Sequence, residues 1–368
     1  MPWSTSSTPG SIPGCVGLPE GAAAPSSERL LEVDDLRVTF QTRAGAVRAV
    51  DGLSLTVGPR EVLGIVGESG SGKSVAMYSV LGLVRDPNAV VEGRVRFQGR
   101  ELLGIGDRAL RAVRGRQIAM IFQDPMTALT PVYTVGWHIA EQIRAHERIS
   151  RRAARGRAIE LLGEVGIPDP QRRVDSYPHE FSGGMRQRAV IAMALSCSPV
   201  LLIADEPTTA LDVTTQAQIL DLMRNLLHTH GSSIVLITHN MGVISEIADR
   251  VVVMYAGRAV EEGRKEAVIR APQHPYTWGL LGAVPRLGSK RRRLATIPGS
   301  PISPLNVPPG CAFAPRCRER FARCSERPEL RGAGGHRDAC WLPPEDRERR
   351  RLLALERALA ADRAGGQA

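Results

Sequence analysis

The stretch GESGSGKS, residues 67–74, constrains the fold of this 368-residue chain more than any other feature. It fits the pattern G-x-x-x-x-G-K-[ST], in which glycines let backbone N–H groups curl around phosphate oxygens. The apolar run EVLGIVG precedes it, as expected of a strand buried on both faces, and the helically spaced SVAMYSVLGLV follows it. This order of strand, loop and helix predicts an α/β fold in which a helix N-terminus meets phosphate.

Each residue type in this loop suits nucleotide binding. The Lys73 ammonium can reach the β- and γ-phosphates, and the Ser74 hydroxyl can ligate Mg²⁺. A merely flexible Gly/Ser turn would not require a buried strand before the loop and a helix after it. We therefore predict a nucleotide site formed by Gly67, Glu68, Ser69, Gly70, Ser71, Gly72, Lys73 and Ser74.

A second motif, VLLIADEPTTALD, places two carboxylates at the end of an apolar strand. Such a strand delivers Asp205 to the phosphate end of a parallel sheet, where its carboxylate can hold the Mg²⁺ shell. Glu206 then lies beside it, placed to polarise an attacking water. Taken alone, an Asp-Glu pair after a strand is as readily a helix N-cap. Together with the phosphate loop, the pair indicates a hydrolytic nucleotide site.

Several further motifs resemble those of ABC-type ATPases and occur in that family's order, so the chain is identified as a member. FSGGMRQR is similar to the family's signature sequence, FQDP to its Q-loop, TALD to its D-loop and ITHN to its switch histidine. The resemblance implies ATP and Mg²⁺ as cofactors and ATP hydrolysis as the reaction. It also implies an ABC-type nucleotide-binding domain with a RecA-like parallel sheet, an antiparallel β layer and a helical signature subdomain.

The resemblance implies that ATP is shared between two subunits. Ser182, Gly183 and Gly184 would offer a hydroxyl and backbone N–H groups to the γ-phosphate held by a partner's phosphate loop. A single domain of this kind therefore cannot complete a catalytic site alone. The commonest signature ends in Gln, and Met185 stands there instead, which weakens any claim about the activity of the site that this loop completes.

Other roles carry over by position in the motifs. Gln123 would sense Mg²⁺ and water while contacting the membrane partner. His239 would keep the γ-phosphate and the catalytic Glu206 correctly placed relative to each other. Asp212 of the D-loop would border the nucleotide. Phe40, at the end of the first strand, would stack on adenine unless it is an ordinary core residue. The expected Mg²⁺ ligands are Ser74, Gln123 and Asp205.

Beyond the ATPase motifs, HPYTWGLLGAVP and IPGSPISPLNVPPGCAFAPRC resemble the oligopeptide and dipeptide importer ATPases. That branch implies a peripheral subunit at the cytoplasmic face of the cell membrane. Its partners would be a second ATPase subunit, in a heterodimer, two transmembrane permease subunits and, indirectly, an extracytoplasmic solute-binding protein. The solute would be a di- or oligopeptide, with nickel or another small solute as the alternative.

The net charge of +10 raises a different possibility, a nucleic-acid partner. The cationic residues are almost all arginine, a skew that coding bias also produces. Soluble ABC ATPases of DNA repair or ribosome recycling carry two ATPase cores, whereas this chain has one phosphate loop. We therefore expect no nucleic acid among the partners.

Four of the six cysteines crowd into the C-terminal region, at Cys311, Cys317, Cys324 and Cys340. A cytosolic protein rarely forms structural disulfides, and adjacent arginines such as Arg316 would favour metal-binding thiolates. Zinc sites usually show paired C-x₂₋₄-C knuckles, which these wider gaps lack. The spacing resembles the cluster-bearing tails of some importer ATPases, so we predict a 4Fe–4S cluster, with zinc or unliganded thiols as alternatives.

The alternation of strand-like and helical runs predicts the organisation of the chain. Runs at 30–40 and 53–57 indicate an antiparallel layer joined through the turn-rich QTRAG, and VLLIA and SIVLIT indicate central parallel strands. Composition then divides the chain. We expect a disordered tail at 1–28, an ABC ATPase domain at 29–270 with its helical subdomain at about 125–194, a small Cys-rich extension at 271–345 and a C-terminal helix or tail at 346–368.

Overall fold

The predicted antiparallel layer is present as a four-stranded sheet in the order β2-β1-β4-β5. The computed structural model describes residues 29–124, 128–209, 211–283 and 297–364. QTRAG is the tip of a hairpin in which Thr42 pairs with Gly45, so both strands run further than predicted. A two-residue turn lets the ladder continue to the tip. The strands are β1 (Leu31–Thr42), β2 (Gly45–Val57), β4 (Ala89–Phe97) and β5 (Arg100–Glu101).

The central sheet has seven strands in the order β11-β10-β9-β3-β8-β7-β6. From β9 to β6 neighbouring strands are parallel, and β10 and β11 add an antiparallel edge. Every residue of β3, β7 and β8 is buried, as their continuous apolar runs predict. The strands are β3 (Val62–Val66), β6 (Ile118–Ile121), β7 (Leu201–Asp205), β8 (Ser233–Thr238), β9 (Arg250–Tyr255), β10 (Arg258–Arg264) and β11 (Arg337–Asp338).

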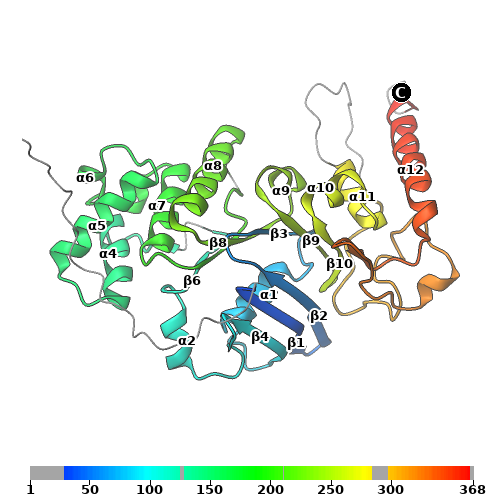
Figure 1. Cartoon of the computed structure of the whole chain (residues 1–368), viewed down its shortest axis with the longest axis horizontal. Coiled ribbons are helices and arrows are strands. Elements are labelled where there is room, and N and C mark those ends of the chain that lie inside the picture. The colour runs from blue at the N-terminus through cyan, green and yellow to red at the C-terminus, as the bar shows by residue number, and fades with distance from the viewer. Residues whose placement is uncertain (1–28, 125–127, 210, 284–296, 365–368) are drawn as a thin grey trace, which may run out of the picture.

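Helices α4 to α7 gather at one end of the molecule, and the C-terminal segment lies at the other (Figure 1). Side chains at N-caps explain where several helices begin: Thr134, Ser150 and Ser182 each accept a backbone N–H of the first turn. No helix in the described ranges is long and apolar enough to cross a membrane. The helices are α1 (Lys73–Val80), α2 (Asp107–Val113), α4 (Val135–His146), α5 (Arg151–Glu164), α6 (Pro170–Arg173), α7 (Gly183–Leu195), α8 (Val213–His230), α9 (Met241–Ile247), α10 (Lys265–Arg270), α11 (Pro275–Gly282) and α12 (Pro344–Ala364), with 3₁₀ turns at Pro178–Glu180 and Ala322–Ser325.

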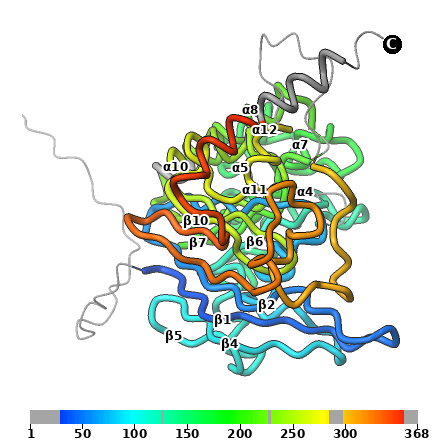
Figure 2. The backbone as a smooth tube through the Cα atoms, turned by 90° about the vertical axis from the view of Figure 1, so that its right-hand side faces the viewer, coloured from blue at the N-terminus to red at the C-terminus, as the bar shows by residue number. Residues whose placement is uncertain are grey.

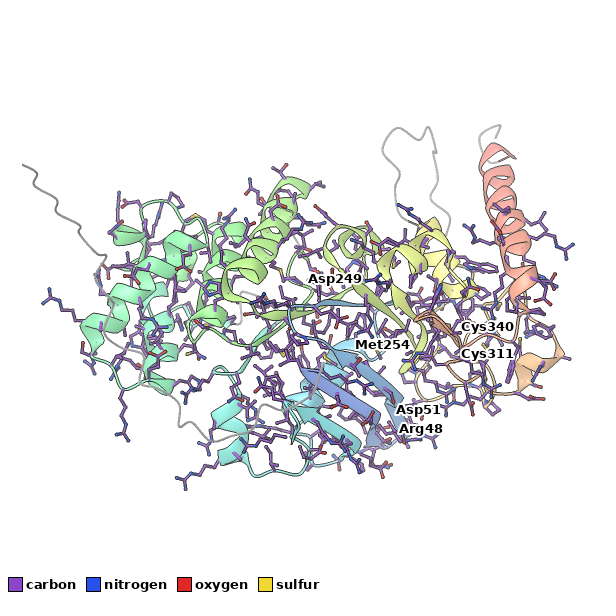
Figure 3. All side chains as sticks on the ribbon, in the orientation of Figure 1. Arg48, Asp51, Asp249, Met254, Cys311 and Cys340 are labelled. Atoms are coloured by element: carbon purple, nitrogen blue, oxygen red, sulfur yellow. The ribbon has the colours of Figure 1, made fainter. Side chains whose placement is uncertain are left out.

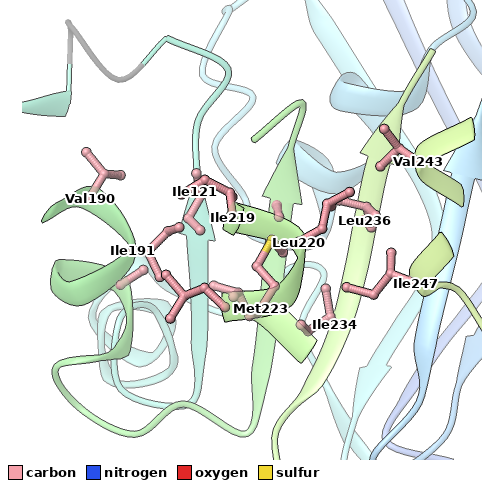
Figure 4. Close-up of a cluster of buried hydrophobic side chains, with 14 of the residues drawn as sticks. Ile121, Val190, Ile191, Ile219, Leu220, Met223, Ile234, Leu236, Val243 and Ile247 are labelled. Atoms are coloured by element: carbon pink, nitrogen blue, oxygen red, sulfur yellow. The ribbon is translucent and has the colours of Figure 1, made fainter. Parts of the chain in front are cut away.

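Two apolar cores hold the layers together, and β3 contributes to both. Val62 and Val66 belong to the larger core, whereas Leu63 and Ile65 belong to the second core, which also takes in the antiparallel sheet. This split follows from the alternation of side chains along a strand. In the larger core, side chains of α7, α8 and α9 pack on the sheet (Figure 4). Each fully buried aliphatic side chain contributes about 1.5–3 kcal/mol.

The C-terminal segment joins the edge of the central sheet. Strand β11 pairs with β10 through Glu261–Asp338 and Glu262–Arg337. Asp338 also accepts a hydrogen bond from Arg347 at the start of α12, at 2.6 Å. Figure 2 shows this segment, in orange and red, running beside β10 and β2. A strand of two residues carries no periodic pattern, so the sequence did not predict it.

His274 gives the fold a predicted sensitivity to acid. Its buried Nδ1 accepts the Tyr276 N–H at 3.1 Å and so caps α11. Burial, and to a lesser extent Arg347, lowers the pKa of His274 from 6.5 to about 3. Below pH 6.5 an unfolded chain therefore binds a proton that the folded chain does not, so stability falls as the pH drops towards 3. We expect denaturant titrations to show this loss.

The variant His274→Asn tests the assignment, because asparagine can cap a helix without binding a proton. Its stability should depend less steeply on pH than that of the wild type across the same acid range. The control is His179→Asn, at an exposed position. An unchanged acid slope in His274→Asn would assign the acid sensitivity to another group.

Candidate functional site

The phosphate loop follows β3, and only glycine fits two of its positions. A Cβ on Gly67 would lie 2.2 Å from the carbonyl oxygen of Met254, which lies at the centre of the molecule (Figure 3). Gly72 has a φ of +95°, and its Cβ would meet the Ala49 carbonyl oxygen at 2.2 Å. Any side chain at either position would push the loop away from the sheet. The glycine pattern thus specifies a loop pressed tightly against β9 and β2.

Lys73 is buried in this loop with its ammonium surrounded by oxygen. Its Nζ donates to the carbonyl oxygens of Gly67 at 2.8 Å and Glu68 at 2.9 Å, and to the Ser71 hydroxyl at 3.3 Å. Burial lowers the pKa of Lys73, and the carboxylates of Glu206, Asp205 and Glu68 oppose that shift. The ammonium is therefore held at the loop by hydrogen bonds that a phosphate oxygen can replace.

Asp205, at the end of β7, meets the first turn of α1. Its Oδ1 accepts the Ser74 hydroxyl at 2.9 Å, and its Oδ2 accepts the Tyr78 hydroxyl at 3.0 Å. Burial raises the pKa of Asp205, and the two hydroxyls oppose that shift. Hydroxyl and carboxylate oxygens are the hard ligands that Mg²⁺ takes beside phosphates, so Ser74 and Asp205 fit this ion. When bound, Mg²⁺ supplies positive charge that offsets the charge developing on the phosphates.

Tyr78 was not expected in this site, and its role can be tested. Burial, and then Asp205, raises the pKa of Tyr78 to about 12, so the hydroxyl stays protonated and donates to Asp205. Partners that orient a metal-binding carboxylate typically change metal affinity 10- to 100-fold. We expect Tyr78→Phe to raise the Mg²⁺ concentration for half-maximal ATPase activity about 10-fold.

The matched control for this variant is Tyr133→Phe, which removes the hydroxyl of an exposed tyrosine. Both variants are measured as a Mg²⁺ titration at fixed ATP concentration. Equal Mg²⁺ requirements in Tyr78→Phe and the wild type would rule out a role for this hydroxyl in placing Asp205.

Glu206 is the centre of a second group of contacts. Its Oε1 lies 3.0 Å from His239 Nδ1, and its Oε2 accepts from the Thr209 hydroxyl at 2.8 Å and from Gln123 Nε2 at 3.2 Å. Burial raises the pKa of Glu206, but the hydrogen bonds from His239 and Thr209 outweigh it, so the pKa lies below its ordinary value. The backbone of Glu206 is left-handed, with φ at +48°, a strain that is common at functional sites.

This geometry can support hydrolysis at a phosphate. An ionised carboxylate at Glu206 can accept the proton of an attacking water, and His239 and Thr209 hold that carboxylate in place. The amide nitrogen of Gln123 donates to Glu206, which is not one of the expected Mg²⁺ ligands. The role of Gln123 as a ligand stays a prediction.

The signature residues contact a different part of the chain. Ser182 and Gly183 are exposed at the start of α7. A Cβ on Gly184 would lie 2.7 Å from Thr215 Cγ2, and Thr215 donates its hydroxyl and its N–H to Asp212 at 2.6 and 2.9 Å. The signature thus packs on the D-loop side of α8. An exposed Ser182–Gly183 pair is what a loop that serves a neighbouring subunit requires.

The structure also shows where the residues of three other sequence predictions lie. Met185, which replaces the usual glutamine, packs against the larger apolar core. Phe40 is partly buried against the second core, and its contact with adenine stays a prediction. Ser69 and Gly70 are exposed at the loop tip. Sequence patterns missed Tyr78 and Thr209, although the four-residue spacing of Tyr78 from Ser74, which puts both on one face of α1, was a usable signal.

The prediction of a 4Fe–4S cluster is contradicted. Among the described residues, which include Cys311, Cys317, Cys324 and Cys340, no group of three or more His, Cys, Asp or Glu side chains could hold a metal ion. This finding also gives no support to zinc. Figure 3 shows Cys311 and Cys340 at the end of the molecule away from α4 to α7.

Burial opposes the thiolate form that was expected of these cysteines. Burial raises the pKa of Cys317 and Cys340 to about 12, which favours the neutral thiol. Arg316, expected to favour the thiolate, turns its guanidinium towards Glu68. Adjacency in sequence therefore did not place the positive charge beside the sulfur.

Two family descriptions match the chain. The family described as ABC transporter matches residues 50–209, and that described as oligopeptide/dipeptide transporter, C-terminal region, matches residues 260–324. The first covers the phosphate loop, the signature and both carboxylates. The second covers most of β10, all of α11 and three of the four C-terminal cysteines.

Similar proteins agree with these matches. The chain is 51% identical over 320 residues, 86% of its own length and 96% of the other, to a Brucella abortus protein named "Putative peptide import ATP-binding protein". It is 48% identical over 324 residues, 87% and 97% of the two lengths, to the dipeptide transport ATP-binding protein DppD of Bacillus subtilis. A dimeric ATP-binding cassette, MJ0796, solved in a post-hydrolysis state bound to ADP and Pi, superposes with a TM-score of 0.58 at 26% identity, over 64% of this chain and 98% of that one. The chain belongs to the ABC transporter family, among the ATP-binding subunits of its oligopeptide/dipeptide branch.

Proposed function

We propose that this chain is the ATP-hydrolysing subunit of a peptide importer. The observation that carries the proposal is a complete set of contacts at one site. Ser74 meets Asp205, and Glu206 meets His239, where the neighbouring strands β3, β8 and β7 end. The near full-length relatives named for peptide import and dipeptide transport support peptide as the solute class.

In this proposal two ATPase subunits form each catalytic site. The loop at residues 67–74, with Asp205, would bind Mg·ATP, and the exposed Ser182 and Gly183 would close on the nucleotide of a partner. Gln123, Glu206 and His239 would be the catalytic residues, and Asp212, Gly184 and Phe40 would complete the nucleotide contacts. A second, different ATPase chain fits this arrangement, because importers of this branch are expected to pair two such subunits.

The proposed partners in the membrane are two permease subunits, which would convert closure of the ATPase pair into alternating access. A solute-binding protein on the far side would deliver the peptide. The chain would then be peripheral, held at the cytoplasmic face by the permeases. We retain the division into a tail at 1–28, an ATPase domain at 29–270, a Cys-rich extension at 271–345 and a C-terminal helix or tail at 346–368 as part of this proposal.

Reconstitution with its permease and ATPase partners in vesicles tests the function. Uptake of dipeptides, longer peptides and Ni²⁺ is measured in competition, with ATP hydrolysis recorded in parallel. ATP-dependent uptake of peptides that excess Ni²⁺ does not reduce is the expected result. Uptake of Ni²⁺ alone would move the solute to the alternative class, and binding to protein-free anionic vesicles at physiological salt would argue against recruitment by permeases.

A further inference from the structure

The C-terminal segment reaches the phosphate loop directly at Glu68. Arg316 donates two hydrogen bonds to the Glu68 carboxylate, from Nη1 to Oε2 at 2.6 Å and from Nη2 to Oε1 at 3.0 Å. Tyr276, in the first turn of α11, accepts the backbone N–H of Glu68 at 2.8 Å. Arg316 and Tyr276 lie 248 and 208 positions from Glu68 in the sequence. The fold therefore brings both residues of the C-terminal region to one residue of the ATP-binding loop.

Glu68 passes this constraint on to the phosphate-binding lysine. Its carbonyl oxygen accepts from Lys73 Nζ at 2.9 Å and from the Ser71 N–H at 3.2 Å. The N–H, the carbonyl and the carboxylate of one residue are thus all held by partners. A displacement of Glu68 would carry the Lys73 ammonium away from the position in which it meets phosphate.

Arg316 is itself held firmly in place. It is 7% exposed, and it donates from Nε to the Pro298 carbonyl at 2.9 Å and from Nη1 to the Tyr255 hydroxyl at 3.4 Å. A bidentate ion pair of this kind is among the stronger hydrogen-bonded contacts in proteins. Loss of one partner would leave the other charge poorly compensated. The pair is therefore a specific connection and not a solvated surface contact.

An aromatic cluster fixes the turn that carries Arg316. Phe313 lies with its ring centre 5.3 Å from those of both Tyr255 and Tyr276, and Tyr255 lies 4.7 Å from Tyr276. The Arg316 N–H donates to the Phe313 carbonyl at 3.0 Å, which closes the turn. Tilted and edge-on ring pairs at these distances are favourable. The position of Arg316 is therefore tied to β9 and α11.

We propose that Arg316 and Tyr276 are positioning residues for ATP binding, which hold Glu68, and through it Lys73, in the geometry that receives phosphate. The inference rests on the proposed ATP-hydrolysing function of this loop. It makes the C-terminal segment part of the ATP site, although both residues lie outside the phosphate loop. A displacement of the turn around Arg316 would weaken ATP binding from outside the site.

Charge alone predicts a different pattern of mutant effects. Glu68 is a negative group beside a site for phosphates, so removing its charge would tighten ATP binding if only electrostatics mattered. Removing the positive charge of Arg316 would weaken binding on the same view. Positioning through the ion pair predicts weaker binding in both cases. The sign of the effect of Glu68→Gln therefore separates the two explanations.

The experiment measures equilibrium binding of ATP to the full-length chain and KM and kcat for ATP in the reconstituted transporter. We expect Glu68→Gln and Arg316→Gln each to raise the Kd and KM about 10-fold, with kcat at saturating ATP nearly unchanged. The double variant should bind ATP no more weakly than either single variant, because both remove the same contact. Controls are Glu266→Gln and Arg318→Gln, two exposed positions with the same charge changes.

Tyr276→Phe gives an independent arm that leaves the ring packing intact and removes the acceptor of the Glu68 N–H. It should also raise KM more than it lowers kcat. A Kd in Glu68→Gln that is unchanged or lower would overturn the proposal, and so would additive losses in the double variant. If Arg316→Gln fails to fold, the measurements on Glu68→Gln and Tyr276→Phe still test the proposal. A wild-type chain that binds no ATP would instead refute the proposed function.

Discussion

Glu206→Gln is expected to lower the ATP turnover of the reconstituted transporter by about 10²- to 10⁴-fold while ATP still binds. The variant keeps the size and most hydrogen bonds of the side chain but removes the ionised carboxylate, which His239 and Thr209 hold at 3.0 and 2.8 Å. Without that base, the proton of the attacking water has no acceptor at this position. ATP-bound subunit pairs should then accumulate.

Phosphate release and size-exclusion chromatography with ATP measure the two effects. Glu266→Gln, which removes an exposed carboxylate, is the control and should turn over ATP like the wild type. Wild-type turnover in Glu206→Gln would mean that another group is the base. Loss of ATP binding together with turnover would point instead to a structural role for this carboxylate.

Lys73→Ala is expected to weaken ATP binding by about 100-fold, the loss typical of removing charge-assisted hydrogen bonds. The buried ammonium bonds to the carbonyls of Gly67 and Glu68, so its removal also leaves two loop carbonyls without this donor. Both effects act on the loop before any chemistry takes place. The Kd for ATP should therefore rise even in the absence of partner subunits.

Equilibrium binding with a fluorescent ATP analogue measures this loss. Lys265→Ala is the matched control, since Lys265 is partly exposed and its nearest ionic partner is Glu266 at 3.8 Å. Retained affinity in Lys73→Ala would contradict the assignment of Lys73 to phosphate. A large drop in thermal stability would be separated from the binding effect by measuring both variants well below their melting temperatures.

The catalytic end of the sheet was predictable from the sequence because its chemistry follows the ends of parallel strands. Strands β3, β8 and β7 are neighbours, so the segments that follow them meet at one edge. The loop at residues 67–74, the Asp205–Glu206 pair and His239 all occupy those segments. Each was recognisable by its motif, and because the three strands are neighbours, the three motifs lie together in one site.

The C-terminal region was less predictable, because its partners are remote in the sequence. The four cysteines and the adjacent arginines suggested a metal cluster, but the arginine beside Cys317 pairs with Glu68, and burial favours neutral thiols. Likewise β11 is a strand only because β10 offers a free edge for two residues. The spacing of residues along the chain shows which side chains could bind a metal, but it does not show where those side chains point in the folded protein.

The fold class, the family and the phosphate loop were therefore predictable from the residues alone, because glycine conformations and apolar strand runs act locally. Three contacts were not predictable in this way: Tyr78 donates to Asp205, Thr209 donates to Glu206, and Arg316 donates to Glu68. These contacts depend on which buried polar groups are left to satisfy one another once the layers have packed. That pairing is a property of the assembled core and surface, and no local pattern encodes it.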